Sequence, residues 1–254
     1  MITPNHHATG TPTHAAAWLS VAVLGLAILL AAGAGPAYRL ELLSLREAFS
    51  LLRYGVYCAI AASALGLLTL LIGAWQRRPA PAFAGALALA ISLGIAYVPY
   101  SHWRLAQSVP PIHDITTDTD NPPAFIALAQ AREAAPNAVD HPGEATARQQ
   151  HAAYPDIAPL FLQADLSTVR EAARAQVASS GWTAAEISED GIEATATTRW
   201  FGFKDDVVIR MRVENGVVRV DMRSASRVGR SDVGANAARI RAYLKALDQR
   251  VAAQ

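Results

Sequence analysis

Three charge-free stretches dominate the first hundred positions of the chain. Residues 15–34, 54–75 and 81–100 contain no Asp, Glu, Lys, Arg or His. A helix of about 20 residues spans the roughly 30 Å hydrocarbon core of a bilayer. Six aromatic residues lie near the ends of these stretches, where interfacial belts form: Trp18, Tyr54, Trp75, Tyr97, Tyr100 and Trp103. The sequence therefore predicts three transmembrane helices within residues 15–107, after a polar leader of residues 1–14.

These stretches have the character of an anchor or partner-binding element rather than of a transporter. Because no charged side chain lies inside them, an ion or proton pathway is not indicated. Small residues recur at intervals of four at Ala86, Ala90 and Gly94, and again at Ala62 and Gly66, which predicts a closely packed seam. Alanine is so common here that chance spacing is an alternative explanation.

The arginines between the stretches predict the orientation. Arg77 and Arg78 separate the second and third stretches and indicate a cytoplasmic loop by the positive-inside rule. Arg39, Arg46 and Arg53 lie seven residues apart, which is typical of a short helix in the interface whose arginines snorkel to the headgroups. If that helix is discounted, the N-terminus is cytoplasmic and the polar half of the chain lies outside the cytoplasm.

From residue 108 to residue 254 the composition is that of a soluble domain. Asp120 or Asn121 is the expected cap of a first helix, and Asp232 that of the last. The expected elements are a helix at 124–132, a long connection at 134–153, a strand at 158–163, a helix at 167–180 with a capping box at Thr168 and Glu171, strands at 182–188, 192–200 and 207–213, a fourth strand containing Val218 to Met222, and a helix at 233–251. The order β-α-β-β-β-β-α predicts a two-layer α+β sandwich with an antiparallel sheet and its helices on one face.

Turn signals fix the register of the expected sheet. Asn215-Gly216 is the strongest short hairpin signal, Asp190-Gly191 is a second, and Gly181 is the expected end of the preceding helix. A two-residue turn at 215–216 pairs three apolar couples on one face: Val213 with Val218, Met211 with Val220, and Ile209 with Met222. Register and hydrophobic pattern therefore agree.

Two long motifs resemble a known family. They are Pro110–Pro123, PPIHDITTDTDNPP, and Thr197–Arg241, TTRWFGFKDDVVIRMRVENGVVRVDMRSASRVGRSDVGANAARIR. Both resemble the bacterial and plastid family catalogued as domain of unknown function 1499, over about Val109 to the C-terminus. The resemblance implies an envelope or membrane-associated protein and supplies no activity, catalytic residue or cofactor. With the orientation above, we expect a multi-pass protein of the bacterial inner (cytoplasmic) membrane with a periplasmic C-terminal domain.

The first motif contains a candidate catalytic set of His113, Asp114, Asp118 and Asp120. Asp-x-Asp spacing among hydroxyls is able to hold Ca²⁺, and His113 with Asp114 is able to act as a general base with its orienting group. No glycine makes the turn and no bidentate Glu follows, however. A strand edge that leads into a capped helix explains the same residues without a site, and we weigh that interpretation above a metal-dependent enzyme or hydrolase.

A second group of residues predicts anion binding. The register sets Arg212 opposite Arg219 and Arg210 opposite Asp221, and like charges face to face are unfavourable unless something screens or binds them. The N-terminus of the last helix also favours anions. The candidate ligand-binding residues are Arg210, Arg212, Arg219, Arg223, Arg227, Arg230 and Asn236. The alternative is a solvated sheet face neutralised by residues 101–198, which carry 13 acids against 5 bases.

The leading hypothesis is a membrane-anchored envelope protein, not an enzyme, whose outer domain binds an anionic ligand, a lipid headgroup or another membrane protein. A subunit of a larger membrane complex is a further alternative. No nucleophile elbow, phosphate-binding loop, CxxC or HExxH occurs in the sequence, so we expect neither a cofactor nor a metal. The net charge of +1 argues against nucleic acid as a partner.

Overall fold

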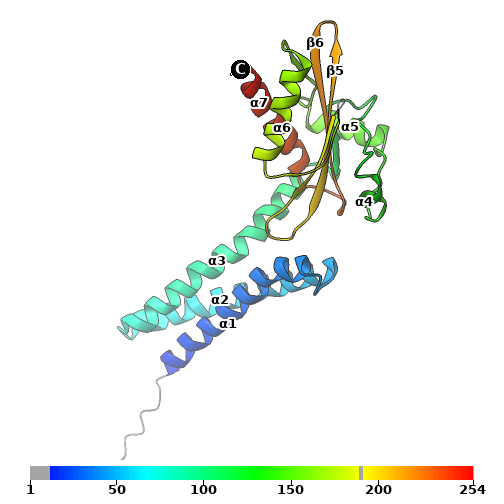
Figure 1. Ribbon diagram of the computed structural model, residues 1–254. Coiled ribbons are helices and arrows are strands. Elements are labelled where there is room, and N and C mark those ends of the chain that lie inside the picture. The colour runs from blue at the N-terminus through cyan, green and yellow to red at the C-terminus, as the bar shows by residue number, and fades with distance from the viewer. Residues whose placement is uncertain (1–11, 189–190, 254) are drawn as a thin grey trace, which may run out of the picture. The chain divides into compact units, whose positions relative to one another are not determined.

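The computed structural model describes residues 12–188 and 191–253, which belong to two units divided after Trp103 (Figure 1). The first unit holds three long helices, the last of which continues into the second unit: α1 (Pro12–Arg39), α2 (Leu45–Trp75) and α3 (Pro79–Ser108). All three are long and apolar enough to cross a membrane, so the three predicted spans are confirmed at this level.

Each of these helices is longer than the charge-free stretch inside it. The expected interfacial helix around Arg46 and Arg53 does not exist as a separate element, because both residues lie in the first turns of α2, while Arg39 ends α1. The physical reason is a capping box. The backbone N–H of Glu47 donates to Ser44 Oγ over 3.3 Å, and the Ser44 N–H donates to Glu47 Oε2 over 2.8 Å.

The seam between the helices is confirmed on α2 and shifted on α3. Ala62 and Gly66 are buried as expected, whereas Ala90 and Gly94 are exposed and Ala86 is half-buried. The buried face of α3 consists of Pro81, Gly85, Ala88 and Ser92. Their spacing of four, three and four follows the 3.6-residue turn, which a strict four-residue repeat does not.

Gly85 makes the closest approach on this seam, and we expect Gly85→Leu to lower the melting temperature of the detergent-solubilised chain. A Cβ at Gly85 would lie 2.5 Å from the Leu70 nitrogen and 2.6 Å from the Gly66 oxygen. Overpacking of this kind costs about 1–3 kcal/mol. Gly94→Leu is the matched control, because no atom of the described residues lies within 4 Å of a Cβ there. Equal losses at both positions would contradict the seam.

The second unit is built around a six-stranded antiparallel sheet. Its elements are β1 (Asp114–Thr116), α4 (Ala129–Glu133), α5 (Glu144–Ala153), β2 (Leu160–Leu162), α6 (Leu166–Ser179), β3 (Thr183–Ile187), β4 (Gly191–Thr197), β5 (Lys204–Glu214), β6 (Val217–Ser226) and α7 (Ala235–Ala252). The strand order is β1-β6-β5-β4-β3, and β2 pairs with the other half of the same β6 edge. The predicted α+β class is confirmed, and β1 is an additional strand.

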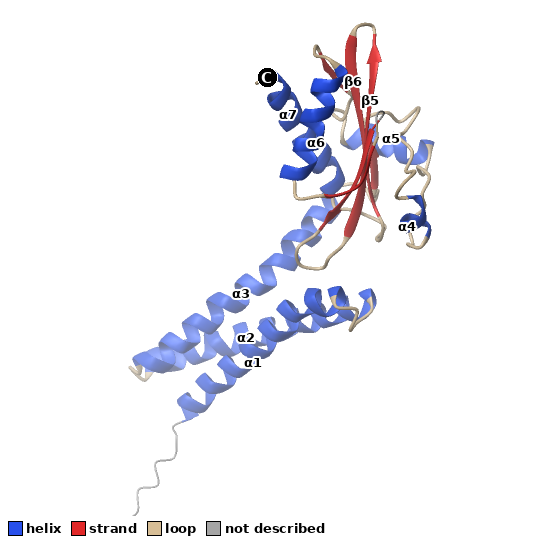
Figure 2. Cartoon of the chain, viewed as in Figure 1, coloured by secondary structure: helices blue, strands red, loops and turns tan. Residues whose placement is uncertain are grey.

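The sheet has two different faces. On one face lie α6 and α7, over an apolar core that includes Ile209, Met211, Val220, Met222, Ile240 and Leu247 (Figure 2). The predicted hairpin register is confirmed at all three apolar couples, and Asn215 and Gly216 both have positive φ, at 52° and 81°. The other face is also covered, by residues 117–143 with α4, where the sequence predicted helices on one face only.

Local predictions between the strands are partly wrong. The expected helix at 124–132 is reduced to α4, and Asn121 caps nothing; its N–H donates to Asp118 Oδ1 over 2.9 Å. The expected connection at 134–153 contains α5. The first difference arises because contacts with the sheet, described below, hold residues 126–128 in place of local helix propensity.

The two later helices begin and end close to the expected residues. The N-cap of α6 is Asp165, and the expected capping box at Thr168 and Glu171 is wrong because both residues lie inside the helix. Gly181 follows α6 with a φ of 69°, as expected for a helix stop. The N-cap of α7 is Gly234, two residues after the expected Asp232, although Asp232 Oδ2 accepts the N–H of Asn236 in the first turn over 2.7 Å. Of the expected turn at Asp190-Gly191, the first residue lies outside the described residues.

Candidate binding face

The sheet face opposite α6 and α7, here called the polar face, carries four acidic and four basic side chains. Because side chains alternate along a strand, one half of β5 and β6 supplies the apolar core and the other half this face. The residues that face this side are Asp114, Glu193, Thr195, Asp206, Val208, Arg210, Arg212, Arg219, Asp221, Arg223 and Ala225. Several of these side chains are fully buried, so their charges need partners inside the protein.

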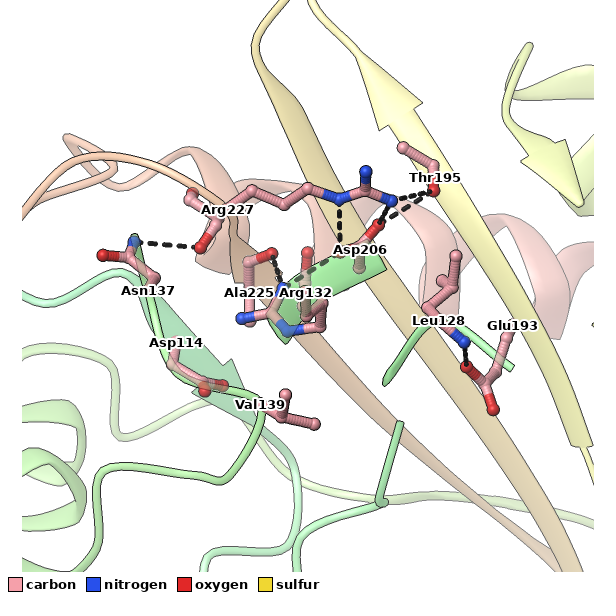
Figure 3. A network of polar contacts seen from close by, with 12 residues as sticks. Asp114, Leu128, Arg132, Asn137, Val139, Glu193, Thr195, Asp206, Ala225 and Arg227 are labelled. Atoms are coloured by element: carbon pink, nitrogen blue, oxygen red, sulfur yellow. Dashed lines mark hydrogen bonds and ion pairs between the residues drawn. The ribbon is translucent and has the colours of Figure 1, made fainter. Parts of the chain in front are cut away.

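Asp206 holds two guanidinium groups at once (Figure 3). Its carboxylate is fully buried and accepts Arg227 Nε and Nη2, both over 2.8 Å. On its other side Arg132 Nη1 donates to Oδ2 over 3.1 Å, and the Thr195 hydroxyl donates to Oδ1 over 2.8 Å. Burial lowers the pKa of Arg132, and the charge of Asp206 opposes that shift. Asp206 therefore joins the sheet to α4 and to the segment after β6.

A second buried ion pair lies beside the first. Arg223 binds Asp114 in a bidentate arrangement, with Nε to Oδ1 at 3.0 Å and Nη2 to Oδ2 at 2.8 Å. The ring of Phe125 lies under both guanidinium groups, 4.6 Å from that of Arg223 and 4.5 Å from that of Arg132. Arg223 also donates to the carbonyl oxygen of Val139 over 2.9 Å. Residues 117–143, which cover the polar face, are thus held by Arg223 from the sheet and by their own Arg132.

Glu193 fixes the start of α4. Its Oε1 accepts the backbone N–H groups of Ile126 and Ala127 over 2.8 and 3.0 Å, and its Oε2 accepts that of Leu128 over 3.0 Å. A carboxylate is the favoured partner for the unpaired N–H groups at a helix start. This strand residue therefore explains why residues 124–128 form a turn in place of the expected helix.

A three-arginine cluster, Arg210, Arg212 and Arg219, lies at the end of the polar face near the 215–216 turn. Arg212 is directly opposite Arg219, and Arg210 opposite Asp221, as the sequence predicted. Asp221 resolves the like-charge contact: Oδ2 accepts Arg210 and Arg212 over 3.0 and 3.2 Å, and Oδ1 accepts Arg219 over 3.0 Å. Asp118 Oδ2 also accepts Arg210 and Arg219, over 3.0 and 2.9 Å. The cluster is partly exposed, most of all at Arg212, whose side chain is 37% exposed.

A groove of about 310 Å³ lies next to this cluster. Its lining includes Pro123, Ile126 and Val208 on the apolar side and Arg210 and Glu193 on the polar side. Ile126 is 79% exposed, which is unusual for a side chain of its size. The groove is therefore amphiphilic, with an apolar wall and a guanidinium group beside it.

The remaining candidate anion-binding residues lie elsewhere. Arg227 turns inward onto Asp206, and Arg230 is exposed in the following loop. Asn236, in the first turn of α7, is buried, and its side-chain nitrogen donates to Ser226 Oγ over 3.0 Å and to the His113 carbonyl oxygen over 2.9 Å. Three of the seven candidates therefore lie in the partly exposed cluster. The other four, Arg223, Arg227, Arg230 and Asn236, lie outside it.

The acidic motif is not brought together around a common point. Asp114 binds Arg223, Asp118 binds arginines of the three-arginine cluster, and Asp120 is exposed. His113 is half-buried, and burial lowers its pKa. In residues 12–188 and 191–253, no group of three or more His, Cys, Asp or Glu side chains is arranged to hold a metal ion.

Sequence reasoning missed the residues that hold the covering segment. Phe125 and Arg132 looked like ordinary residues of a surface helix, and Glu193 like an outward-facing strand residue. The hydrogen bonds and cation–π contacts that they make between the sheet and residues 117–143 span 65 to 98 positions of the chain, so no local pattern marks them. The one available signal is that Glu193 occupies the same strand face as Thr195, opposite the apolar positions of β4.

Comparison with known proteins decides the family. One family model, described as protein of unknown function (DUF1499), matches residues 114–247. The chain belongs to this family. The match begins at β1 and ends in α7, so it contains every ion pair of the polar face. Searches of the curated proteins and of the solved structures find no match.

Arg227 and Arg230 offer a matched test of the buried network. We expect Arg227→Gln to lower the free energy of unfolding by about 1–3 kcal/mol, because it removes two hydrogen bonds to a buried carboxylate. Arg230→Gln changes an exposed side chain and is expected to stay within about 0.5 kcal/mol of the parent. Denaturant titration of the full chain in detergent measures both. Equal effects would contradict the inward position of Arg227.

Proposed function

We propose that the chain is a membrane-anchored binding protein whose domain takes an amphiphilic anion, a small apolar body that ends in a phosphate or carboxylate. The observation that carries this proposal is the amphiphilic groove next to the three-arginine cluster. Its apolar wall is formed by Pro123, Ile126 and Val208. Arg210 belongs both to the cluster and to the lining of the groove. A volume of about 310 Å³ lies at the small end of ligand pockets.

The charge balance of the cluster favours a weak, exchangeable anion. Its three arginines are offset by Asp118, Asp221 and the more distant Glu214, so the cluster is close to neutral. Glu186 and Glu193 add two acidic residues to the lining of the groove. Guanidinium groups have five N–H donors each, and an incoming anion competes with the carboxylates for them. The apolar wall then contributes the selectivity for an amphiphile over a free anion.

A titration with three small probes tests the proposal. The full chain in phosphatidylcholine nanodiscs is titrated with hexyl phosphate, inorganic phosphate and hexanol by calorimetry, against empty nanodiscs. We expect hexyl phosphate to bind more tightly than either of the other two. Ile126→Ser is expected to weaken hexyl phosphate binding about tenfold, since it removes apolar contact worth roughly 1–1.5 kcal/mol.

Val213→Ser is the control for that variant, because Val213 is also exposed, at 60%, and does not line the groove. Equal binding of all three probes, or equal effects of the two variants, would reject the groove as the site. Added phosphatidylglycerol separates two sources of the anion. Competition with hexyl phosphate means that a lipid headgroup fills the site, and its absence means a free ligand.

We also propose that the N-terminus is cytoplasmic and the domain periplasmic, in the bacterial inner membrane. Arg77 and Arg78 stand together in the three-residue connection between α2 and α3, which supports a cytoplasmic loop. Arg39 and Arg46 flank the connection on the other side, so the proposal rests on the adjacency of Arg77 and Arg78. A cytoplasmic site for the domain corresponds to the opposite orientation.

Reporter fusions test this orientation. An alkaline phosphatase joined after Gln254 is expected to be active, because that enzyme folds only outside the cytoplasm. The same reporter joined after Trp75 is expected to be silent, and a green fluorescent protein at the same two positions to give the reverse. The opposite pattern would place the domain in the cytoplasm and discard the periplasmic proposal, while leaving the groove untouched.

A further inference from the structure

The loop between β4 and β5 lies at the sheet end where the chain enters from α3. A row of backbone contacts crosses the sheet at this end. The Ser226 N–H donates to the His113 carbonyl oxygen over 2.9 Å, and the Arg227 N–H donates to that of Lys204 over 3.0 Å. Lys204 in turn pairs with Thr197, the last residue of β4. The first residues after α3 and the β4–β5 loop therefore lie at the same end of the sheet.

The connection from α3 to this edge is short. Helix α3 ends at Ser108, and only residues 109–113 precede β1. Six peptide steps reach at most about 20 Å. The connection is also fastened to the domain, because Ile112 is buried and its carbonyl oxygen accepts the N–H of Asp232 over 3.1 Å. The start of β1, at this end of the sheet, is therefore within about 20 Å of Ser108, the last residue of α3.

The loop has the composition of a membrane-interface segment. Residues 199–204, here called the aromatic tip, read Arg-Trp-Phe-Gly-Phe-Lys. Trp200 is 42% exposed, although aromatic side chains of this size usually pack inside a domain. Tryptophan is enriched at headgroup level, where its ring is partly in lipid and its N–H reaches water. Arg199 and Lys204, both exposed, are suited to anionic headgroups.

The aromatic tip is held in one shape by its own hydrogen bonds. The Gly202 N–H donates to the Thr198 carbonyl oxygen over 3.0 Å, and the Phe203 N–H donates to Thr198 Oγ1 over 2.8 Å. The ring centroids of Trp200 and Phe201 are 5.0 Å apart, and those of Phe201 and Phe203 are 4.9 Å apart. A surface ordered in advance loses little conformational entropy when it binds.

The opposite end of the same sheet differs in chemistry. The β5–β6 turn at Asn215-Gly216 is flanked by Glu214 and Val213, without an aromatic side chain between β5 and β6. Of the three aromatic residues of the tip, Phe201 is buried and Phe203 half-buried, so Trp200 is the exposed one. The aromatic tip lies at one end of the sheet, the end at which the chain enters from α3.

We propose that the aromatic tip inserts into the interface of the bilayer that α3 crosses. Trp200 lies at headgroup level, and Arg199 and Lys204 contact anionic headgroups. The domain is then attached to the membrane at two points, through α3 and through the tip. This contact is independent of the groove and holds for either leaflet, so it does not depend on the proposed function or orientation.

Quenching of tryptophan fluorescence by brominated lipids tests the proposal. The full chain is reconstituted in vesicles of phosphatidylcholine and phosphatidylglycerol, with and without bromine on the upper acyl carbons. The emission of Trp200 is obtained as the difference between the parent chain and Trp200→Phe. We expect this difference emission to be quenched by the brominated lipid. Unquenched emission would place Trp200 outside the bilayer and overturn the proposal.

Trp182→Phe is the matched control, because Trp182 stacks on the buried Tyr243 at 5.3 Å in the core of the domain. Its difference emission is expected to be unaffected by bromine. Quenching of Trp182 to the same degree would mean that the whole domain, and not the tip, is immersed, and would overturn the proposal as stated.

A second measurement keeps the test valid if Trp200→Phe fails to fold. Spin labels are attached to single cysteines at Arg199→Cys or at Val213→Cys, both in a Cys58→Ala background. A label at 199 is expected to collide more with oxygen, which concentrates in lipid, than with a water-soluble nickel chelate. A label at 213 is expected to show the reverse. Equal exposure of both labels to the chelate would reject membrane contact, and would show instead that the tip faces water or a soluble partner.

Discussion

The burial of carboxylate–guanidinium pairs on one face of the sheet is the interaction on which the soluble domain depends. Asp206 and Asp114 are buried charges, and each is acceptable only because arginines from distant segments supply hydrogen bonds to both of its oxygens. Those arginines belong to β6, to the segment that follows it, and to α4. A buried charge left without its partner is costly. The pairs therefore favour the one arrangement of residues 117–143 that brings each arginine to its carboxylate.

This constraint explains the form of the candidate site. The groove exists because Ile126 is held by Glu193, which accepts its N–H, and Pro123 is held by Arg223, whose Nη1 donates to the Pro123 carbonyl oxygen. It also explains why this sheet face is not simply an anion site. All four of its arginines bind the protein's own carboxylates, and the three of the cluster near the 215–216 turn are also partly exposed. The buried and the partly exposed arginines are thus separated along one strand face.

The sequence was a good guide wherever the information is local. Apolar length predicted the three long helices, and the alternation around Asn215-Gly216 predicted the register of β5 and β6 residue by residue. It was a poor guide between Asp120 and Ala153, where helix propensity and capping residues indicated one helix at 124–132. There, a carboxylate 65 or more positions away competes for the same backbone N–H groups and wins, because it is buried and charged.

The sequence by itself determined the membrane region, the α+β class, the hairpin register, the opposition of Arg212 to Arg219 and the family. Each of these depends on periodicity, turn chemistry or motif, which are readable along the chain. Only the tertiary structure decided which arginines are paired with carboxylates, that Arg227 turns inward, and that a groove lies beside Arg210. The physical reason is that the solvation of a charge depends on which distant groups exclude water around it, and chain order does not record that.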